Sequence, residues 1–333
     1  MSPPLGVGLI GHGKAGRGFH EPLIRSVDGL QLGRIVAGRA DVAGLEALLA
    51  DATVGAVVIA TPNESHFDLA RRSLLAGKHV VVDKPFTVTS DEARALIDIA
   101  RDQRRILTVF HNRRWEGDFR TLRLLIEQGR LGRVIYYEAR FDRFRNEPRP
   151  GAWREGDRPG SGILFDLGSH LIDQVLVLFG LPQGVTADIR TERDFGASDD
   201  CFDLWLHYPR LKVSLTAGMM VREPAPRFTI RGTRGTFVKA GLDPQEAALA
   251  AGRSPRDEGW GREPRQQWGT LITDQSQDTI ETLPGAYQFF YENLREAIAG
   301  REPVSVRPEE ALATIEIIEA AVRSNRERRS IDL

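Results

Sequence analysis

The sequence is poor in cysteine and lacks long apolar runs. Cys201 is the single cysteine among 333 residues, so no intrachain disulfide can form, and a reducing compartment fits this composition. No apolar stretch is long enough to cross a bilayer, and the N-terminus has no charged segment followed by an apolar core and a cleavage site. We therefore expect a cytoplasmic protein that does not bind membranes.

An excess of charge of either sign is also lacking. Lys and Arg number 45, Asp and Glu number 46, and the formal net charge is −1. Because no basic run is interleaved with aromatic residues, nucleic acid is not an expected partner. Hydrophobic residues make up 41% and charged residues 27%, as in ordinary globular proteins, and the length predicts about two domains.

A glycine-rich turn follows the first predicted strand, Leu5–Ile10. Gly11, Gly13 and Gly16 give the pattern G-x-G-x-x-G, and an amphipathic stretch continues through Ile24. The first glycine permits a tight turn, the second lets backbone approach a pyrophosphate, and the third lets helix pack on strand. A helix N-terminus then presents N–H groups to the phosphates. At a strand–helix junction the pattern favours dinucleotide binding over a plain tight turn.

The next part of the chain alternates strands and helices. Buried strands are predicted at 30–37, 57–60, 79–82 and 106–110, with helices at 64–76 and from Thr89 through Arg101. This alternation predicts a Rossmann-type, doubly wound parallel sheet over residues 1–114. Ligands of such sheets bind beyond the carboxyl ends of the strands. The residues expected there are Gly11, Thr61, Lys84 and Asn112.

One segment of this domain is unusually short. Residues 40–54 must connect the second strand to the third, and 41–49 can supply one helix and little else. A complete βαβ unit takes about 30 residues. We therefore expect that a helix and an adjoining strand beside the adenosine are missing, which puts cofactor affinity in doubt.

Residues 115–333 show a different pattern. A long strand is predicted at 134–144, and four more follow at 184–190, 202–207, 212–219 and 227–231 with no helices between these four. They predict an α+β domain with a large, open, mostly antiparallel sheet. Residues 253–267 are expected to form a surface loop, and 287–298 and 308–323 to form closing helices. Because an open sheet must cover its outer face, we expect a homo-oligomer, a dimer or a tetramer.

A helix predicted at Leu164–Phe179 is apolar on nearly every side, which is typical of a buried helix. Asp166, His170 and Asp173 nevertheless stand at i, i+4 and i+7 on one face. Buried ionisable groups are unfavourable unless paired. The stripe itself leaves open a structural Asp–His pair in a core and a catalytic pair.

Taken together, these motifs resemble those of the Gfo/Idh/MocA-type oxidoreductases along essentially the whole chain. The matching marks are GHGKAG at Gly11, TPN at Thr61, DKP at Asp83, where the family more often has EKP, and D-x-G-x-H at Asp166. The stretches HVVVDKPFTVT, FHNRRW and GSGILFDLGSHLIDQ are most similar to the NADP-dependent scyllo-inositol dehydrogenase subgroup.

The resemblance implies a dehydrogenase that transfers a hydride between a nicotinamide cofactor and a CH–OH group of a cyclitol or sugar. In the family, the lysine of EKP assists proton transfer and holds the substrate, which corresponds to Lys84. Asp166 and His170 then contact the substrate, with His170 as acid/base partner of the oxidised hydroxyl. An imidazole titrates near working pH and an ammonium stabilises a developing alkoxide. No metal is expected in this site.

Further residues are expected on the cofactor side. Asn63 and His66 stand where family members line the dinucleotide, although Asn63 equally fits a helix N-cap. Arg114 and Trp115 are expected to close over the cofactor, with core packing as the alternative for Trp115. Trp153 resembles a cofactor-side contact.

The second strand is predicted to end in Gly38-Arg39, with no acid before Asp41. An acid there would bind the ribose 2′-OH of NAD, whereas an arginine suits the 2′-phosphate. We therefore expect NADP, with NAD as the alternative cofactor and an exposed turn arginine as the alternative for Arg39. Two rival functions are a reductase of another keto-sugar and a non-catalytic dinucleotide-dependent regulator. The joint presence of Lys84, Asp166 and His170 argues against the regulator.

Overall fold

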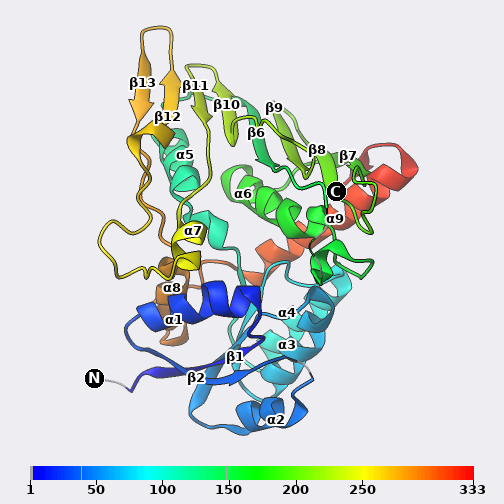
Figure 1. Cartoon of the computed structure of the whole chain (residues 1–333), viewed down its shortest axis with the longest axis vertical. Helices are drawn as coiled ribbons and strands as arrows, with labels where there is room; N and C mark the ends of the chain where they lie inside the picture. Colours follow the sequence, from blue (N-terminus) through cyan, green and yellow to red (C-terminus); the bar gives the residue numbers. More distant parts are fainter. Residues whose placement is uncertain (1–2, 39, 148, 150) are drawn as a thin grey trace. The chain divides into compact units, whose positions relative to one another are not determined.

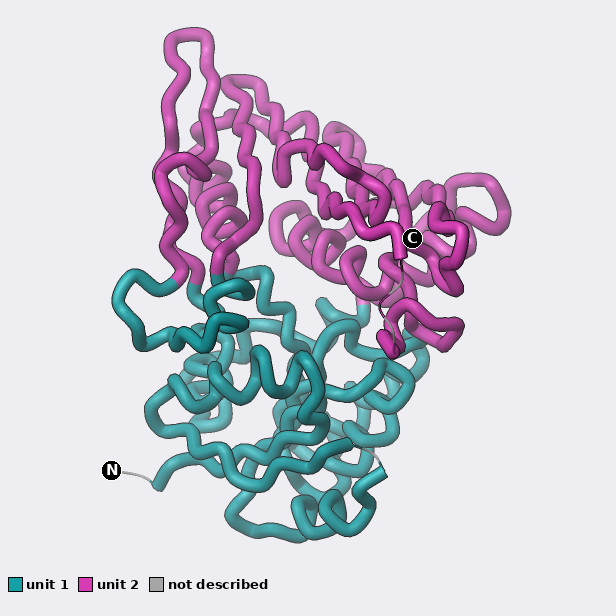
Figure 2. Tube along the Cα trace, viewed as in Figure 1, with its two compact units in different colours: residues 1–115, 245–260, 286–312 teal, residues 116–244, 261–285, 313–333 magenta. Residues whose placement is uncertain are grey.

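The computed structural model describes residues 3–38, 40–147, 149 and 151–333. The chain forms two compact units, shown in Figure 2. Unit 1 comprises residues 1–115, 245–260 and 286–312, and unit 2 comprises 116–244, 261–285 and 313–333. The chain first passes from unit 1 to unit 2 after residue 115 and returns to unit 1 in two later segments. The assignment of cofactor and substrate to residues 1–114 and 115–333 stays a prediction.

Unit 1 contains a five-stranded sheet in the order β2-β1-β3-β4-β5. All four neighbouring pairs are parallel, which confirms the doubly wound arrangement. Long β-branched runs make the inner strands buried on both faces, as parallel sheets require. The strands are β1 (Leu5–Ile10), β2 (Leu30–Val36), β3 (Val54–Ile59), β4 (His79–Asp83) and β5 (Leu107–Phe110).

Helices connect the strands of this sheet, and α3 and α4 lie side by side (Figure 1). Thr89 caps α4 in a capping box with Glu92, as the sequence predicts. Two helices come from the later segments. The helices of unit 1 are α1 (Glu21–Ser26), α2 (Val42–Ala50), α3 (His66–Leu75), α4 (Ser90–Asp102), α7 (Gln245–Ala250) and α8 (Gln288–Ile298), and α9 (Pro308–Glu327) begins there.

The short connection between β2 and β3 holds one helix, α2. Asp41 begins it, because its carboxylate accepts a hydrogen bond from the Gly44 N–H at 2.9 Å. No further strand lies between β2 and β3 in the described part of this connection, so the predicted shortening is confirmed. Strand β2 is the edge of the sheet and stays largely half-buried or exposed.

Unit 2 contains a nine-stranded sheet in the order β13-β12-β11-β10-β6-β9-β8-β7-β14. Among its described strands, β6 and β9 pair in parallel and the other neighbours pair antiparallel. This confirms a large, mostly antiparallel sheet. Its strands are β6 (Val134–Asp142), β7 (Gly184–Arg190), β8 (Cys201–Tyr208), β9 (Leu211–Gly218), β10 (Phe228–Gly232), β11 (Thr236–Lys239), β12 (Gly269–Ile272), β13 (Gln277–Ile280) and β14 (Ile331–Asp332).

The alternating exposure of β6 shows that the sheet has one covered face. Tyr137, Ala139 and Phe141 are buried, whereas Tyr136 and Glu138 are half-buried. Helices of this unit are α5 (Gly117–Glu127), α6 (Ser169–Phe179) and the larger part of α9. In the described residues, no helix combines the length and the apolar character needed to span a membrane.

Candidate functional site

The glycine-rich turn is held by close backbone contacts. Gly11 has φ +97°, and a Cβ on it would lie 2.4 Å from the Ala60 carbonyl oxygen. A Cβ on Gly16 would lie 2.0 Å from the Gly11 carbonyl oxygen. A Cβ on Gly13, in contrast, would meet nothing within 4 Å. The first and third glycines are therefore fixed by packing, and the second faces open space, as the approach of a pyrophosphate to this backbone requires.

A π-helical turn, η1 (Gly16–His20), leads from the glycines into α1. Such turns are rare and occur often at functional sites. The Arg17 N–H donates to the Gly13 carbonyl oxygen at 3.0 Å, which holds the turn against the start of the helix. His20, the last residue of η1, is fully buried.

Thr61, Asn63 and His66 follow the carboxyl end of β3. Asn63 is buried and begins a short 3₁₀ helix, η2 (Asn63–Ser65), whereas Ser65 stands at the N-cap of α3. The N-cap alternative for Asn63 is therefore wrong. Ser65 Oγ donates to Thr61 Oγ1 at 2.7 Å, which joins the start of α3 to the end of β3.

His66 lies between two backbone carbonyls. Its Nδ1 is 2.9 Å from the Pro85 oxygen and its Nε2 is 3.0 Å from the Thr61 oxygen. The ring is fully buried, and this burial lowers the pKa of His66. Both ring nitrogens thus face backbone carbonyls, and His66 joins the loop after β3 to the loop after β4. Its assignment to the cofactor site stays a prediction.

Lys84 follows β4 and is 9% exposed. Its backbone N–H donates to Asp83 Oδ1 at 3.0 Å. The same carboxylate oxygen lies 3.6 Å from His20 Nε2. Lys84 is therefore a nearly buried cation whose neighbours along the chain are firmly held.

Asn112, Arg114 and Trp115 belong to the 3₁₀ helix η3 (Asn112–Trp115) after β5, and Asn112 is buried. Arg114 Nη1 donates to the Glu310 carboxylate at 2.8 Å and to the Ser305 carbonyl at 3.1 Å. Trp115 packs edge-on against Phe290, with ring centroids 5.8 Å apart. The packing alternative thus describes Trp115 well, and Arg114 is anchored to the last segment of unit 1.

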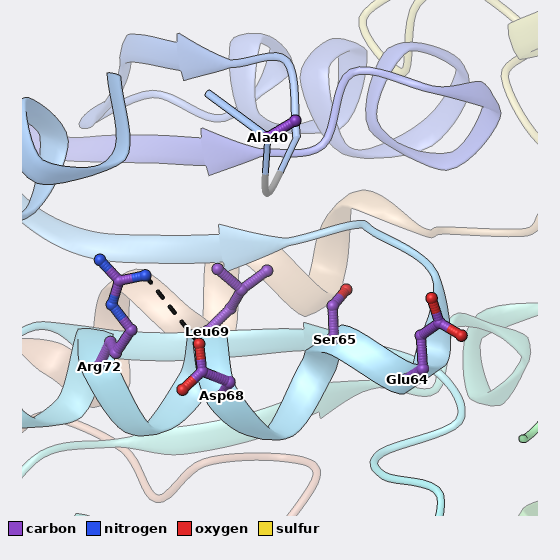
Figure 3. A pocket seen from close by; sticks show the side chains of 6 residues that line it. All are labelled: Ala40, Glu64, Ser65, Asp68, Leu69 and Arg72. Atoms are coloured by element: carbon purple, nitrogen blue, oxygen red, sulfur yellow. Dashed lines mark ion pairs between the residues drawn. The ribbon is translucent and has the colours of Figure 1, made fainter. Parts of the chain in front are cut away.

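A pocket of about 400 Å³ is lined by Ala40, which belongs to the shortened connection between β2 and β3. The sequence analysis expected the adenosine of the cofactor beside this connection. Figure 3 shows Ala40, just after the end of β2, across from the side chains of α3. Arg72 pairs there with Asp68 and with Glu46. Arg39, predicted to read the cofactor phosphate, lies outside the described residues. The lining residues are Ala40, Glu64, Ser65, Asp68, Leu69 and Arg72.

In unit 2, the helix with the D-x-G-x-H motif begins with a second π-helical turn, η5 (Leu164–Gly168), followed by α6. His170 is 4% exposed and Asp173 is buried. The Asp166 side chain, however, is 31% exposed, and its Oδ1 lies 3.3 Å from Arg154 Nε. The expectation of a helix buried on nearly every side is therefore wrong at Asp166 and at the half-buried last turn.

Trp153 belongs to a short 3₁₀ helix, η4 (Trp153–Glu155), in the same unit. The Arg154 guanidinium stacks over the Trp153 ring at 4.4 Å while it pairs with Asp166. Trp153 thus supports the arginine that neutralises Asp166, a link that the sequence did not predict.

Asp199 fixes the start of η5 and was missed by the sequence analysis. Its Oδ2 accepts from the Leu164 N–H at 2.7 Å and its carbonyl accepts from the Ile163 N–H at 2.9 Å. Gly162 has φ +93°, and a Cβ on it would lie 1.9 Å from Asp199 Oδ1. Burial raises the pKa of Asp199 to about 6. The only local signal was a pair of acids in a polar loop.

Unit 1 therefore gathers the predicted residues Gly11, Thr61, Lys84 and Asn112 at the carboxyl edge of a parallel sheet. Unit 2 carries Asp166 and His170 on one continuous helical segment. A glycine-rich turn after the first strand of a five-stranded parallel sheet is the arrangement of a Rossmann-type, dinucleotide-binding domain.

The comparisons with known proteins give the same class. Residues 5–111 match the family described as "Oxidoreductase family, NAD-binding Rossmann fold", and residues 123–333 match "Oxidoreductase family, C-terminal alpha/beta domain". The chain belongs to the Gfo/Idh/MocA family of oxidoreductases.

Its relatives match over the full length. The chain is 41% identical to the uncharacterised oxidoreductase YdgJ of Escherichia coli, covering 100% of both proteins. It is 37% identical to the scyllo-inositol 2-dehydrogenase (NADP(+)) IolW of Bacillus subtilis, covering 98% of this chain and 95% of IolW. The solved structure of the yvaA protein of Bacillus subtilis matches with a TM-score of 0.95 and 36% identity, covering 100% of this chain and 99% of that chain.

Proposed function

We propose that this protein is an NADP-dependent dehydrogenase that oxidises a CH–OH group of a cyclitol, with scyllo-inositol as the first substrate to test. The observation that carries the proposal is the nearly buried Lys84 at the carboxyl edge of a dinucleotide-binding sheet. Similarity to IolW supports the substrate class and the cofactor. The open space at Gly13 and the 400 Å³ pocket beside Ala40 fit a dinucleotide.

In this proposal three residues have separate roles in binding and proton transfer. Lys84 stabilises the developing alkoxide with its ammonium group. His170 accepts the hydroxyl proton at a ring nitrogen, and Asp166 binds a neighbouring hydroxyl with its half-exposed carboxylate. The nicotinamide, when bound, accepts the hydride. Burial around Lys84 and His170 excludes water, which strengthens these interactions.

The test measures formation of reduced nicotinamide by absorbance, with inositol isomers and sugars as substrates and with each cofactor. We expect turnover of a cyclitol with NADP, and we expect Lys84→Ala and His170→Ala each to lower kcat by about 100- to 10,000-fold while NADP binding persists. Near-normal kcat in either variant contradicts the assignment. Consumption of NADPH with a keto-sugar, without oxidation of any cyclitol, supports the rival reductase, and NADP binding with no turnover in either direction supports the regulator.

The proposed preference for NADP rests on Arg39, and the pocket that Ala40 lines has features that oppose it. Glu64 and Asp68 place carboxylates in the pocket wall, and Arg72 is already paired. We propose that Arg39 binds the 2′-phosphate, so Arg39→Ala should weaken NADP binding by about 1.5–3 kcal/mol and leave NAD nearly unchanged. Calorimetric titration of both cofactors measures this, with Arg101→Ala, an exposed arginine of α4 outside the pocket lining, as control. Equal weakening of both cofactors, or tighter NAD binding by the wild type, contradicts the proposal.

We also propose that the open face of the unit 2 sheet is covered by a second copy of the chain. Glu138, Ser214 and Trp205 form one row across β6, β9 and β8, and Trp205 is 38% exposed on this face. An uncovered tryptophan within a wide sheet is typical of an interface. Trp205→Glu should lower the mass measured by sedimentation, whereas Phe195→Glu, in a loop outside the sheet, should not. An unchanged mass, or a monomeric wild type, contradicts this.

A further inference from the structure

We propose that His20, itself held by Tyr291, is a positioning residue that fixes Asp83 and, through Asp83, the adjacent Lys84. The proposal rests on the proposed function, because it assigns a purpose to the exact placement of Lys84. The three supporting side chains come from three separate elements of unit 1, namely η1, α8 and β4.

The geometry forms a buried chain of polar groups. His20 is 0% exposed, and its Nδ1 lies 2.5 Å from the Tyr291 hydroxyl oxygen. Its Nε2 lies 3.6 Å from Oδ1 of Asp83, which is 5% exposed. That carboxylate in turn accepts the Lys84 backbone N–H at 3.0 Å. A line of close polar contacts therefore runs from the hydroxyl of α8 to the backbone of Lys84, and its His20–Asp83 step, at 3.6 Å, is longer than a hydrogen bond.

In this proposal, Tyr291 determines which ring nitrogen of His20 carries the proton. Nε2 is the nitrogen that faces Asp83. Burial, with the charge of Asp83, raises the pKa of Tyr291 well above its ordinary value, so the hydroxyl keeps its proton. In the tautomer that we propose, this hydroxyl donates to Nδ1 of His20. In a neutral imidazole, one nitrogen accepts while the other carries the hydrogen. Nε2–H of His20 is then directed at the Asp83 carboxylate.

Packing holds the imidazole in this orientation. The ring centroids of His20 and Phe110 are 4.5 Å apart, and Phe110 also contacts Phe290 and Tyr291 at 5.0 and 5.8 Å. Because protein interiors are close-packed, the ring cannot turn without displacing these neighbours. The orientation of His20 is therefore a property of the assembled unit.

The other flank of Lys84 is held in a similar way. His66 contacts the carbonyl oxygen of Pro85, the residue after Lys84, as well as that of Thr61. The groups that act on Asp83 include His20, Tyr291, His66 and the Lys84 backbone. The 3.6 Å separation exceeds a hydrogen bond, and such contacts often shorten only in the reactive complex.

The proposal is tested with variants that separate the two ring nitrogens of His20. His20→Asn keeps an amide near Nδ1 and loses the reach to Asp83, whereas His20→Gln places an amide near Nε2. Tyr291→Phe removes only the hydroxyl. The matched control is Tyr137→Phe, because the buried Tyr137 hydroxyl has no hydrogen-bond partner among the described residues.

We expect His20→Asn and Tyr291→Phe to lower kcat by about 10- to 100-fold with an unchanged KM for NADP, since small displacements of a reacting group have effects of this size. His20→Gln should retain most of kcat, and Tyr137→Phe should match the wild type. A merely structural role would lower kcat equally in both His20 variants. Near-normal kcat in His20→Asn and Tyr291→Phe overturns the proposal.

A second measurement needs neither substrate nor cofactor. Acetic anhydride labels the lysines, and mass spectrometry compares Lys84 with the exposed Lys14. In His20→Asn the relative rate at Lys84 should change several-fold, and in His20→Gln it should return toward the wild-type value. If the wild type turns over no cyclitol, the proposed function fails while this labelling still decides the positioning. An unchanged Lys84 rate in every variant overturns it.

Discussion

Two π-helical turns in this protein are held in place by different kinds of contact. Both η1 (Gly16–His20) and η5 (Leu164–Gly168) lead directly into an α-helix and carry site residues. The first is fixed by backbone contacts of Gly11 and Gly16. The second is fixed by the side chain of Asp199, which is 35 residues from its partner Leu164. Gly16 meets the carbonyl of Gly11 close by in the sequence, whereas Asp199 reaches Leu164 across 35 residues, so η5 depends more on tertiary structure than η1 does.

The largest effect on the free energy of unfolding is expected at the glycine-rich turn that leads into η1. Gly16→Ala places a Cβ 2.0 Å from the Gly11 carbonyl oxygen, and backbone cannot yield there as a flexible side chain can. We expect a loss of about 3 kcal/mol in the free energy of unfolding. The matched Gly13→Ala, with nothing within 4 Å, should change stability by less than about 0.5 kcal/mol.

Urea unfolding monitored by circular dichroism measures both variants, and a dinucleotide titration adds a second readout. Gly13→Ala should weaken NADP binding although it leaves the fold intact, because its methyl group enters the open space. Equal stability of the two variants would show that the first turn does not depend on its backbone contacts.

At η5 the corresponding change is Asp199→Ala, which removes the acceptor of the Leu164 N–H. A buried donor without its partner costs about 1–3 kcal/mol. Asp199→Asn keeps a carbonyl oxygen near the same position and should lose less. Urea unfolding measures the two free energies, and an Asn variant no more stable than the Ala variant argues against the capping role.

The smallest expected effects are changes of stability with pH. One titratable group from each unit is compared, Asp199 of unit 2 and His79 of unit 1. Burial raises the pKa of Asp199 from 3.8 to about 6, so its contribution to stability falls as pH rises through that window. Burial lowers the pKa of His79 from 6.5 to about 4, so its contribution falls as pH decreases through that window. The two groups therefore give opposite slopes.

Asp199→Asn and His79→Asn remove these slopes separately. The asparagine at 79 can still accept the Ile106 N–H that His79 Nδ1 accepts at 3.0 Å. Relative to the wild type, Asp199→Asn should gain stability as pH rises from 4 toward 6, and His79→Asn should gain stability as pH falls over the same range. Urea unfolding at several pH values decides this, and parallel curves for all three proteins refute it.

Much of unit 1 was predictable because its signals are local. The glycine spacing predicted the turn, apolar runs predicted the parallel strands, and the shortness of 40–54 predicted the single helix α2. Strands β11, β12 and β13 were missed, since each has four residues and β13 reads Gln-Asp-Thr-Ile, without a buried alternating pattern. They exist because neighbouring strands offer unpaired backbone groups.

The candidate site was predictable as a set of motifs and not as a set of contacts. Asp166 pairs with Arg154 from a separate element, and His66 lies between two carbonyls brought together by folding. Neither carbonyl has a sequence signature. The carboxylate that caps η5 likewise comes from a loop with an ordinary polar composition.

The division of unit 1 among three chain segments has a consequence for synthesis on the ribosome. His20 and its partner Tyr291 are separated by 271 residues. At about 5–20 residues per second, the glycine turn leaves the ribosome roughly 15 to 50 s before the tyrosine is made. During that interval Phe110 and His20 lack their packing partners Phe290 and Tyr291, which belong to α8. Chaperones that bind exposed apolar surface can therefore act on unit 1 during this interval. A chain that ends before α8 has a parallel sheet without the helix that packs on Phe110.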